Sequence, residues 1–200
     1  MFPLGLTLLP GMALPLRLFE DRYLKMYADI IDAEREFGVV LIERGIESRD
    51  DNLTFTVGCA AHIVGSAVNA DGTLALVAIG RSRIRVDEWL PSDPYPRAMV
   101  TELEDDPMSD VGMAALHAAT DQLPGLLAPA AKLNPEFEAT APELSDDPGQ
   151  AVYQLAQLAG LPTLDLQRVL EAGTSDDRAA MVGSMLGETM ELIRLQLGLA

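Results

Sequence analysis

A cysteine and a histidine lie three residues apart, at Cys59 and His62, and such a pair could ligate a metal ion or act as a thiol nucleophile with its base. The apolar segment around them predicts a strand, in which side chains three positions apart point to opposite faces. The two therefore cannot easily share one ion or one proton. We expect Cys59 to be a buried thiol, His62 a structural histidine and His117 a partly exposed helix residue, with no metal or cofactor bound.

Three arginines alternate along another predicted strand, at Arg81, Arg83 and Arg85, and the period of two places them on one face. A basic stripe of this kind could grip the phosphates of a nucleic acid. It has few aromatic neighbours, however, and the net charge of −17 repels phosphate backbones. We favour pairing with nearby carboxylates or solvation, and keep nucleic-acid binding as the alternative.

Carboxylates gather near the middle of the chain, at Glu102, Glu104, Asp105, Asp106 and Asp110. Oxygen ligands of this kind could hold a divalent cation, but the Asp-x-Asp-x-Asp-Gly spacing of a calcium loop is missing. A solvated joint between two domains is the favoured interpretation.

The motifs of common catalytic sites are missing from the chain. It has no Gly-x-x-x-x-Gly-Lys-Ser/Thr loop for phosphates and no Gly-x-Ser-x-Gly elbow. A hydrolase that uses unrecognised residues is therefore the least favoured function. The nine methionines are better explained as gap-filling core, although methionine surfaces also adapt to varied apolar ligands.

The first half of the chain predicts a β-rich domain with one helix. Pro3, Pro10 and Pro15 place two short strands around a Pro10-Gly11 turn, because proline is tolerated at strand starts, edges and turns. A helix over 20–35 follows, with an apolar face at the helical period. The Asp71-Gly72 pair predicts a hairpin. Further strands are expected at 39–42, 54–57, 62–68, 74–79, 81–89 and 97–103, with a loop at 49–52.

The second half predicts a helical bundle. We expect Gly173 to end the third helix as its C′ residue, and Thr174 or Ser175 to cap the last, whose first turn carries two aspartates. The helices are expected at 111–127, 149–159, 164–172 and from the cap to about 197, with the prolines at 129, 135, 142 and 148 keeping the stretch between the first two irregular.

Composition supports a folded protein in a reducing compartment. The chain has 200 residues, 48% of them hydrophobic, and one cysteine, which excludes an internal disulfide and fits the cytoplasm. The charge is uneven, at −4 for residues 1–100 and −13 for 101–200. Prolines interrupt the apolar N-terminus, so we expect no secretory signal, and no apolar run is long enough for a membrane span.

Several motifs, in order, resemble the Lon protease N-terminal (substrate-binding) domain family. They are the opening 2–23, Val57 to Ile63, the Asp71-Gly72 hairpin, Gly80 to Val86 with Ile84 in place of the usual aromatic residue, and Tyr95 to Ala98. The resemblance is clear over 2–104 and weaker over the helices. It implies an α+β fold, with a PUA-like β pseudo-barrel and one helix over 1–106 followed by a C-terminal helical bundle over 107–200.

The resemblance also implies a function. This domain is the substrate-recognition part of Lon proteases and also occurs as a free-standing bacterial protein. The chain carries neither an ATPase module nor a Ser-Lys protease motif. We therefore predict a non-enzymatic module that binds unfolded or apolar polypeptide segments, or a protein partner such as a protease or chaperone. PUA-like folds include RNA binders, which is the alternative. The candidate contact residues are Tyr23, Met26, Tyr27, Tyr95 and Met99, of which the first three could equally be core.

Overall fold

The computed structural model describes residues 1–45, 53–133 and 143–196. The chain forms two compact units, Met1–Glu104 and Asp105–Ala200. The predicted boundary, between 106 and 107, lies two residues further along the chain. That the two parts are domains that fold separately stays a prediction. The expected loop at 49–52, the prolines at 135 and 142 and the last helix's end at 197 lie outside the described residues.

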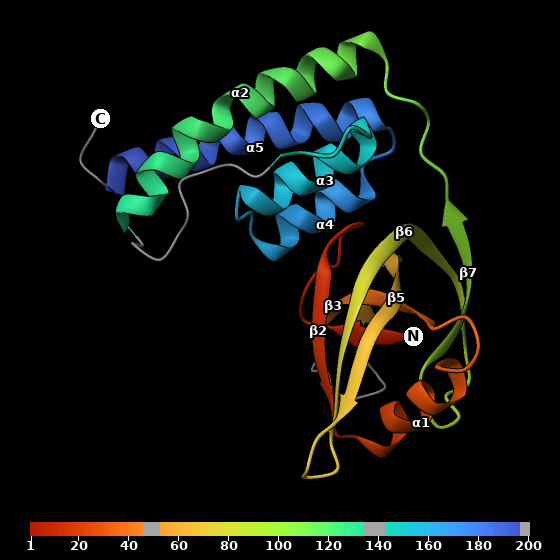
Figure 1. Cartoon of the computed structure of the whole chain (residues 1–200). Coiled ribbons are helices and arrows are strands. Elements are labelled where there is room, and N and C mark those ends of the chain that lie inside the picture. The colour runs from red at the N-terminus through yellow and green to blue at the C-terminus, as the bar shows by residue number, and fades with distance from the viewer. Residues whose placement is uncertain (46–52, 134–142, 197–200) are drawn as a thin grey trace. The chain divides into compact units, whose positions relative to one another are not determined.

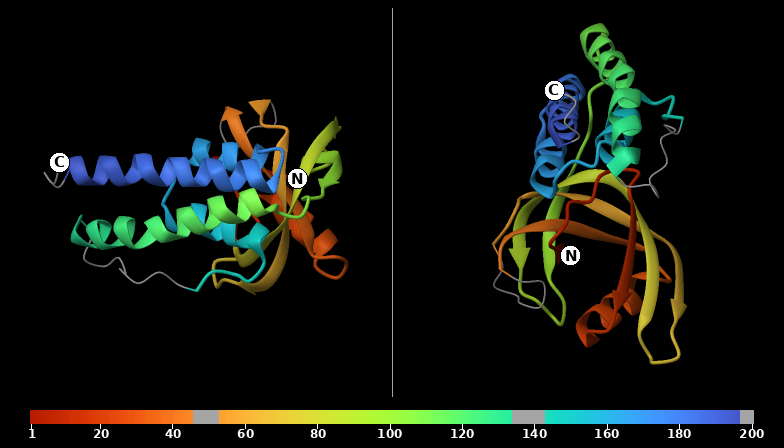
Figure 2. Two further views of the ribbon diagram at one scale, coloured as in Figure 1. Left: turned by 90° about the horizontal axis from the view of Figure 1, so that it is seen from above. Right: turned by 90° about the vertical axis from the view of Figure 1, so that its left-hand side faces the viewer.

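The first unit is built on a curved, mixed β-sheet. Within the described residues its strands are β1 (Phe2–Leu4), β2 (Ala13–Leu18), β3 (Glu36–Arg44), β4 (Leu53–Thr54), β5 (Val57–Val68), β6 (Leu74–Leu90) and β7 (Arg97–Leu103). Their order is β1-β3-β5-β6-β2, with β4 beside β3 and β7 beside β6. The β1–β3 pair is parallel and the other pairs are antiparallel. The strands bend into an arch, with α1 (Asp21–Ile30) at its open end (Figure 2).

The long strand β6 connects both halves of the arch. Two strands were expected, at 74–79 and 81–89, but one strand of 17 residues runs through both. Its first part pairs with β2 and its second part with β7. Gly80 lies between them, where a Cβ would come within 2.2 Å of the Leu9 carbonyl oxygen. Gly80 therefore lets another backbone segment approach closely without ending the strand.

The predicted turns in this unit are confirmed. Gly11 and Gly72 have φ values of 78° and 82°, which favour glycine, and they lie in the turns before β2 and between β5 and β6. Helix α1 is shorter than the expected 20–35, because the chain turns after Ile30 and Arg35 takes a φ of 59°. Strand β3 begins directly after that turn and includes Gly38, which was expected to lie outside it.

The core of the first unit joins α1 to the sheet. The Phe2 ring stacks on that of Tyr23 with centroids 4.0 Å apart, and Phe37 lies 6.2 Å from Phe2. Tyr23 and Met26 belong to the same buried cluster as residues of β2, β3, β5 and β6. The apolar stripe of α1 is therefore largely core.

The second unit is an all-helical bundle. Its helices are α2 (Asp110–Leu133), α3 (Pro148–Leu158), α4 (Thr163–Glu171) and α5 (Ser175–Gln196). Helices α2 and α5 lie side by side and run in the same direction (Figures 1 and 2). Ala119 accordingly lies beside Gly183, and Met190 lies beside Gly125 one to two turns further along. The predicted fold class, α+β with a PUA-like β pseudo-barrel before a helical bundle, is confirmed.

Two predictions about helix ends were wrong. Helix α2 was expected to stop near 127, but it continues through Pro124 and Pro129, because its packing against α5 outweighs the loss of backbone hydrogen bonds. Gly173 does not take the left-handed C′ conformation, since Ala172 already leaves the helix with an extended ψ of 133°. Thr174 does cap α5: its Oγ1 accepts a hydrogen bond from the Asp177 backbone N–H at 3.1 Å.

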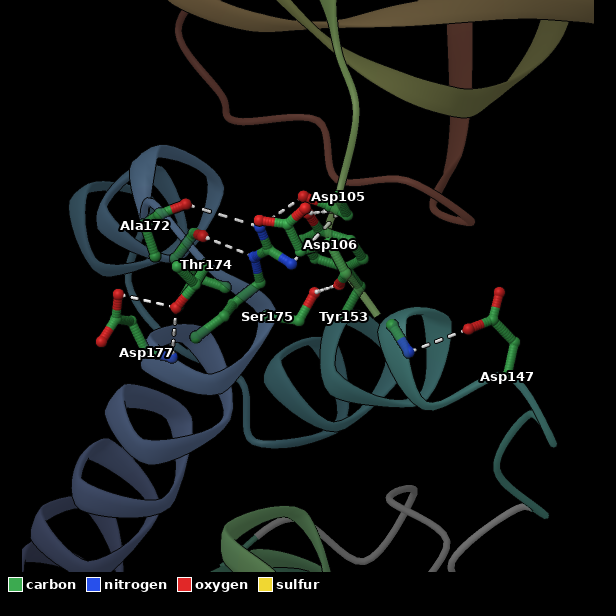
Figure 3. Close-up of polar contacts among 11 residues, drawn as sticks. Asp105, Asp106, Asp147, Tyr153, Ala172, Thr174, Ser175 and Asp177 are labelled. Carbon is green, nitrogen blue, oxygen red and sulfur yellow. Dashed lines mark hydrogen bonds and ion pairs between the residues drawn. The ribbon is translucent and has the colours of Figure 1, made fainter. Parts of the chain in front are cut away.

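An ion pair between a buried arginine and a partly exposed aspartate ties the first residue of the second unit to α5 (Figure 3). Arg178 is fully buried, and its guanidinium donates to both carboxylate oxygens of Asp105, at 2.9 and 3.3 Å. It also donates to the carbonyl oxygens of Val169 and Ala172 and lies 4.8 Å from the centre of the Tyr153 ring. Asp105 is exposed, as expected for a solvated joint, but its carboxylate is also the counter-ion of this buried cation.

Two more contacts extend this attachment, and together with the ion pair we call them the linker clamp. The Ser175 hydroxyl donates to the Asp106 carbonyl oxygen at 3.0 Å. Asp176 accepts hydrogen bonds from both the backbone and the hydroxyl of Ser109, which lower the pKa of Asp176. Because α2 and α5 start side by side, a carboxylate here also offsets the positive ends of both helix dipoles.

Replacing Arg178 with alanine should destabilise the helical unit strongly. The change opens a cavity where a fully buried side chain stood and removes its hydrogen bonds to the Val169 and Ala172 carbonyl oxygens, which should cost about 2–5 kcal/mol. The Asp105 carboxylate that remains is partly exposed and adds little to this cost. Urea unfolding followed by circular dichroism measures this. The matched control is Arg168→Ala, which removes an exposed pair with Asp165 and should cost less than about 0.5 kcal/mol. Equal costs for the two variants would contradict the role of the clamp.

The same unfolding series tests whether the two parts are separate domains. Trp89 is the only tryptophan of the chain and lies in β6, so its fluorescence follows the first unit. If the domains fold separately, Arg178→Ala should shift the circular dichroism transition and leave the Trp89 transition in place. A common shift of both signals would show a single cooperative unit.

Candidate functional site

The inner side of the arch contains an apolar groove of about 420 Å³, which we call the arch groove. Side chains from α1, β3, β5, β6 and β7 surround it, so it depends on nearly every element of the first unit. Two methionines contribute to it, and such side chains adapt to ligands of varied shape. Its lining residues are Met1, Met26, Ile30, Glu36, Phe37, Gly38, Ala60, Ile84, Leu90, Tyr95, Arg97, Ala98 and Val100.

The structure brings two of the five predicted contact residues, Met26 and Tyr95, to the arch groove. Met26 is 1% exposed, so it belongs both to the groove wall and to the hydrophobic core. Tyr95 is half-buried. Tyr23 was a wrong candidate, because it is 3% exposed and stacks on Phe2 in the core. Tyr27 is half-buried and its hydroxyl lies 2.7 Å from that of Ser66. Met99 is 56% exposed on β7 but does not line the groove.

Carboxylates near the groove are neutralised by the chain itself. Asp29 accepts a hydrogen bond from Lys25 and another, at 3.1 Å, from the Tyr95 hydroxyl. These bonds lower the pKa of Asp29, whereas burial and the bond to Asp29 raise that of Tyr95. Glu36 forms an ion pair with Arg81. Neither carboxylate is left to repel an apolar or anionic ligand.

Arg97 is the exception in this charge balance. It lines the arch groove at the first position of β7 and is exposed. Its charge acts on the Tyr95 hydroxyl, whose pKa it lowers against the larger raising effects of burial and Asp29. Arg97 has no ion pair with any residue in the ranges 1–45, 53–133 and 143–196. Met1 also lines the groove, and its ammonium group donates to the Pro96 carbonyl oxygen at 2.8 Å, but burial lowers the pKa of this group to about 6. At neutral pH, Arg97 is therefore the main unbalanced positive charge in the described part of the groove.

A second apolar hollow of about 550 Å³ lies along β2, β5 and β6. We call it the sheet hollow. Small side chains and backbone form much of its wall, and at Gly65 a Cβ would meet no atom within 4 Å. Arg17 at its edge already pairs with Asp71 at 2.5 Å. The lining residues are Pro15, Leu16, Arg17, Gly65, Ser66, Ala67, Ala75, Leu76 and Val77.

Comparison with known proteins places this chain in one family. The model of the ATP-dependent protease La (LON) substrate-binding domain matches residues 1–188. The chain belongs to the LON substrate-binding domain family. The recognition from sequence motifs is therefore confirmed.

Relatives and solved structures agree with this assignment. A Lon protease of Anaeromyxobacter dehalogenans and Lon protease 2 of Myxococcus xanthus are each 28% identical over 191 residues, which is 93% of this chain. A crystal structure of a Lon N-terminal domain protein from Xanthomonas campestris is 25% identical, with a TM-score of 0.64, over 88% of this chain and 91% of that one. The N-terminal domain of a Mycobacterium avium complex Lon protease has the same fold, at 20% identity and a TM-score of 0.65, over 94% and 97% of the two chains.

The chain spans 22% and 23% of the length of the two curated Lon proteases. The family model that it matches is the substrate-binding part. None of the helices in the described ranges combines the length and the apolar character that a membrane span requires.

The arginine stripe is not an exposed phosphate-binding face in this Lon-type domain. Arg81 pairs with Glu36, and Arg85 pairs with Asp87 at 2.9 Å. Arg83 is only 5% exposed. The expectation that the three arginines share one strand face fails at Arg83, because the pairing register of β5 and β6 shifts between Cys59 and Ala61. The favoured interpretation, pairing with carboxylates, is confirmed for the other two.

Cys59 and His62 lie on opposite faces of β5, as predicted. Cys59 is fully buried, whereas His62 is half-exposed with its Nδ1 3.6 Å from a Glu36 oxygen. His117 is exposed on α2. Within the described residues, no three Asp, Glu, His or Cys side chains gather as metal ligands would.

Sequence reasoning missed Arg97 and the wall residues Phe37 and Val100. Phe37 precedes the β-branched run that predicted a strand, and Arg97 is separated from the three alternating arginines. The only available signal for Arg97 was its place in the Tyr95 to Ala98 motif, directly before the uncharged run from Ala98 to Thr101.

Burial should keep the Cys59 thiol unreactive. Burial raises the pKa of Cys59 from 9.0 to about 12, so at pH 8 alkylation of the folded protein should be at least about 100-fold slower than in urea. A thiol-labelling time course in each state measures this. Equal rates in the two states would contradict the buried position.

The raised pKa of Cys59 also sets a direction of pH dependence. The unfolded chain releases this proton near pH 9 and the folded chain does not, so stability should fall as pH rises above 9. The control is Cys59→Ala, which should lose this part of the alkaline decrease.

Proposed function

We propose that this chain is a non-catalytic polypeptide-recognition module that binds unfolded or apolar protein segments in the arch groove. The observation that carries the proposal is the groove itself: a largely apolar cavity of about 420 Å³ with two methionines and two aromatic residues in its wall. Membership of the LON substrate-binding domain family supports it. We also propose that the chain acts together with a protease or chaperone partner.

The physical basis of this binding is burial of apolar surface. Side chains of an unfolded segment gain about 25 cal/mol per Å² when they leave water, whereas folded proteins have already buried theirs. Flexible methionines allow different side chains to fit the same groove. The strongly negative net charge of −17 keeps a protein with exposed apolar surface soluble. Recognition would therefore select unfolded over folded protein.

The arch groove is a better candidate than the sheet hollow. Its wall offers Phe37, Tyr95 and two methionines, which supply large contact areas. The sheet hollow has no aromatic residue and no methionine in its lining, which consists of two leucines, a valine, a proline, an arginine and small residues. Two valines of nearly equal exposure, 42% for Val100 in the arch groove and 41% for Val77 in the sheet hollow, allow a direct comparison.

Val100→Asp should weaken binding of a reduced and alkylated, permanently unfolded polypeptide by about ten-fold or more, because a carboxylate would have to be desolvated in the groove. Fluorescence anisotropy with the labelled polypeptide measures the affinity. The matched control is Val77→Asp, which should bind like the unchanged protein. Loss of affinity in the control alone would move the site to the sheet hollow.

The same titrations at low and moderate salt separate apolar from electrostatic binding. Affinity for the unfolded polypeptide should change little with salt, and a single-stranded RNA should not compete. Steeply salt-dependent RNA binding would overturn the proposal in favour of a phosphate-binding surface. Absence of binding to either probe would also reject it.

A further inference from the structure

Strand β7 has an open edge that is unusual in this sheet. Within the described residues β7 pairs with β6 alone, so its other edge presents unpaired backbone donors and acceptors. Ala98 to Thr101 are uncharged, and Met99 and Val100 are 56% and 42% exposed. Proteins usually protect such edges with charges, proline or short length, because an open apolar edge accepts another strand.

The other edge strands in the described ranges are protected. Strand β2 carries Pro15, which has no backbone N–H, inside the strand, whereas β7 contains no proline and has its charged residues, Arg97 and Glu102, near its ends. Strand β1 has three residues with Pro3 in the middle, and β4 has two residues. The contrast points to β7 as the place where an extended segment would add to the sheet.

The direction of that added strand follows from the charge at the start of β7. An antiparallel segment beside Arg97–Leu103 brings its C-terminal end to Arg97, whereas a parallel segment brings its N-terminal end there. Arg97 has no carboxylate partner among the described residues, and both nearby carboxylates, Asp29 and Glu36, are paired with other cations. A C-terminal carboxylate complements this charge, and an N-terminal ammonium group would be repelled.

We propose that the arch groove receives the apolar C-terminal end of a polypeptide as an antiparallel strand on β7, with its terminal carboxylate at Arg97. This inference rests on the proposed function and names its substrate class. Backbone hydrogen bonds to β7 contribute affinity without sequence preference, the groove selects apolar side chains, and Arg97 selects a free chain end.

The test uses an apolar ten-residue peptide labelled at its N-terminus, made with a free C-terminal carboxylate and as the C-terminal amide. The intact protein should bind the free acid about five-fold more tightly than the amide, as expected for an exposed ion pair. Arg97→Gln should bind both forms alike. The matched control is Arg17→Gln, which removes an exposed arginine at the sheet hollow and should keep the preference for the free acid.

Three results would overturn the inference and leave the proposed function in place. In the first, the unchanged protein binds the acid and the amide with equal affinity, and Val100→Asp still weakens the binding of both peptides. The chain end would then have no role in recognition. In the second, a peptide amide that contains an internal glutamate binds as tightly as the free acid, which would show that any carboxylate can pair with Arg97. In the third, Arg97→Gln still prefers the free acid over the amide, which would show that another residue recognises the chain end. Loss of all peptide and unfolded-polypeptide binding would instead reject the proposed function.

A photo-crosslinking group tests the strand direction independently. Placed at the last residue of the peptide, it should label the protein around Arg97, and placed near the first residue, around Leu103. The reverse pattern would show a parallel strand and contradict the inference.

Discussion

The close passage of β6 beside the Leu9 backbone at Gly80 is the constraint on which the first unit depends. Strand β6 must pass so close to the backbone at Leu9 that a Cβ at position 80 would lie 2.2 Å from a carbonyl oxygen. The backbone N–H and carbonyl of Gly80 bond to Met12 and Gly11 at 3.0 and 2.8 Å, which holds the two segments together. Because β6 continues through this point, its two ends can pair with β2 and β7. The arch, and with it the groove between β3, α1 and β7, follows from that single passage.

The two units differ in how their carboxylates are paired with cations. In the first unit, exposed carboxylates near the groove are each paired with a cation, as for Asp29 with Lys25 and Glu36 with Arg81. In the second unit, a fully buried arginine requires Asp105, and replacing both by apolar residues could be less costly than removing one. The bidentate geometry and the carbonyl contacts of Arg178 suggest that this pair specifies the path of residues 105–109 more than it adds stability.

Local sequence patterns predicted the elements well and their burial less well. Turn chemistry at Gly11 and Gly72, the cap at Thr174 and the order of strands and helices follow from short-range rules. Periodicity also found the apolar face of α1, but a helix stripe has the same spacing whether it is core or binding surface. Only the packing of Phe2 on Tyr23 decides that Tyr23 is core, and that contact joins residues far apart in the chain. The same limit applies to Arg83, whose burial depends on a register shift between two strands.

The remaining question is how a chain of charge −17 could accept a carboxylate. Long-range repulsion between exposed charges is screened over about 8 Å at physiological ionic strength. The carboxylates at or beside the arch groove are paired, because Glu36 forms an ion pair with Arg81 and Asp29 with Lys25. Residues 101–200 carry most of the negative charge, so the excess lies mainly in the unit that does not contain the groove. A single unpaired arginine can therefore determine the local preference, while the distributed negative charge slows the approach of polyanions such as RNA more than that of a chain with one terminal carboxylate.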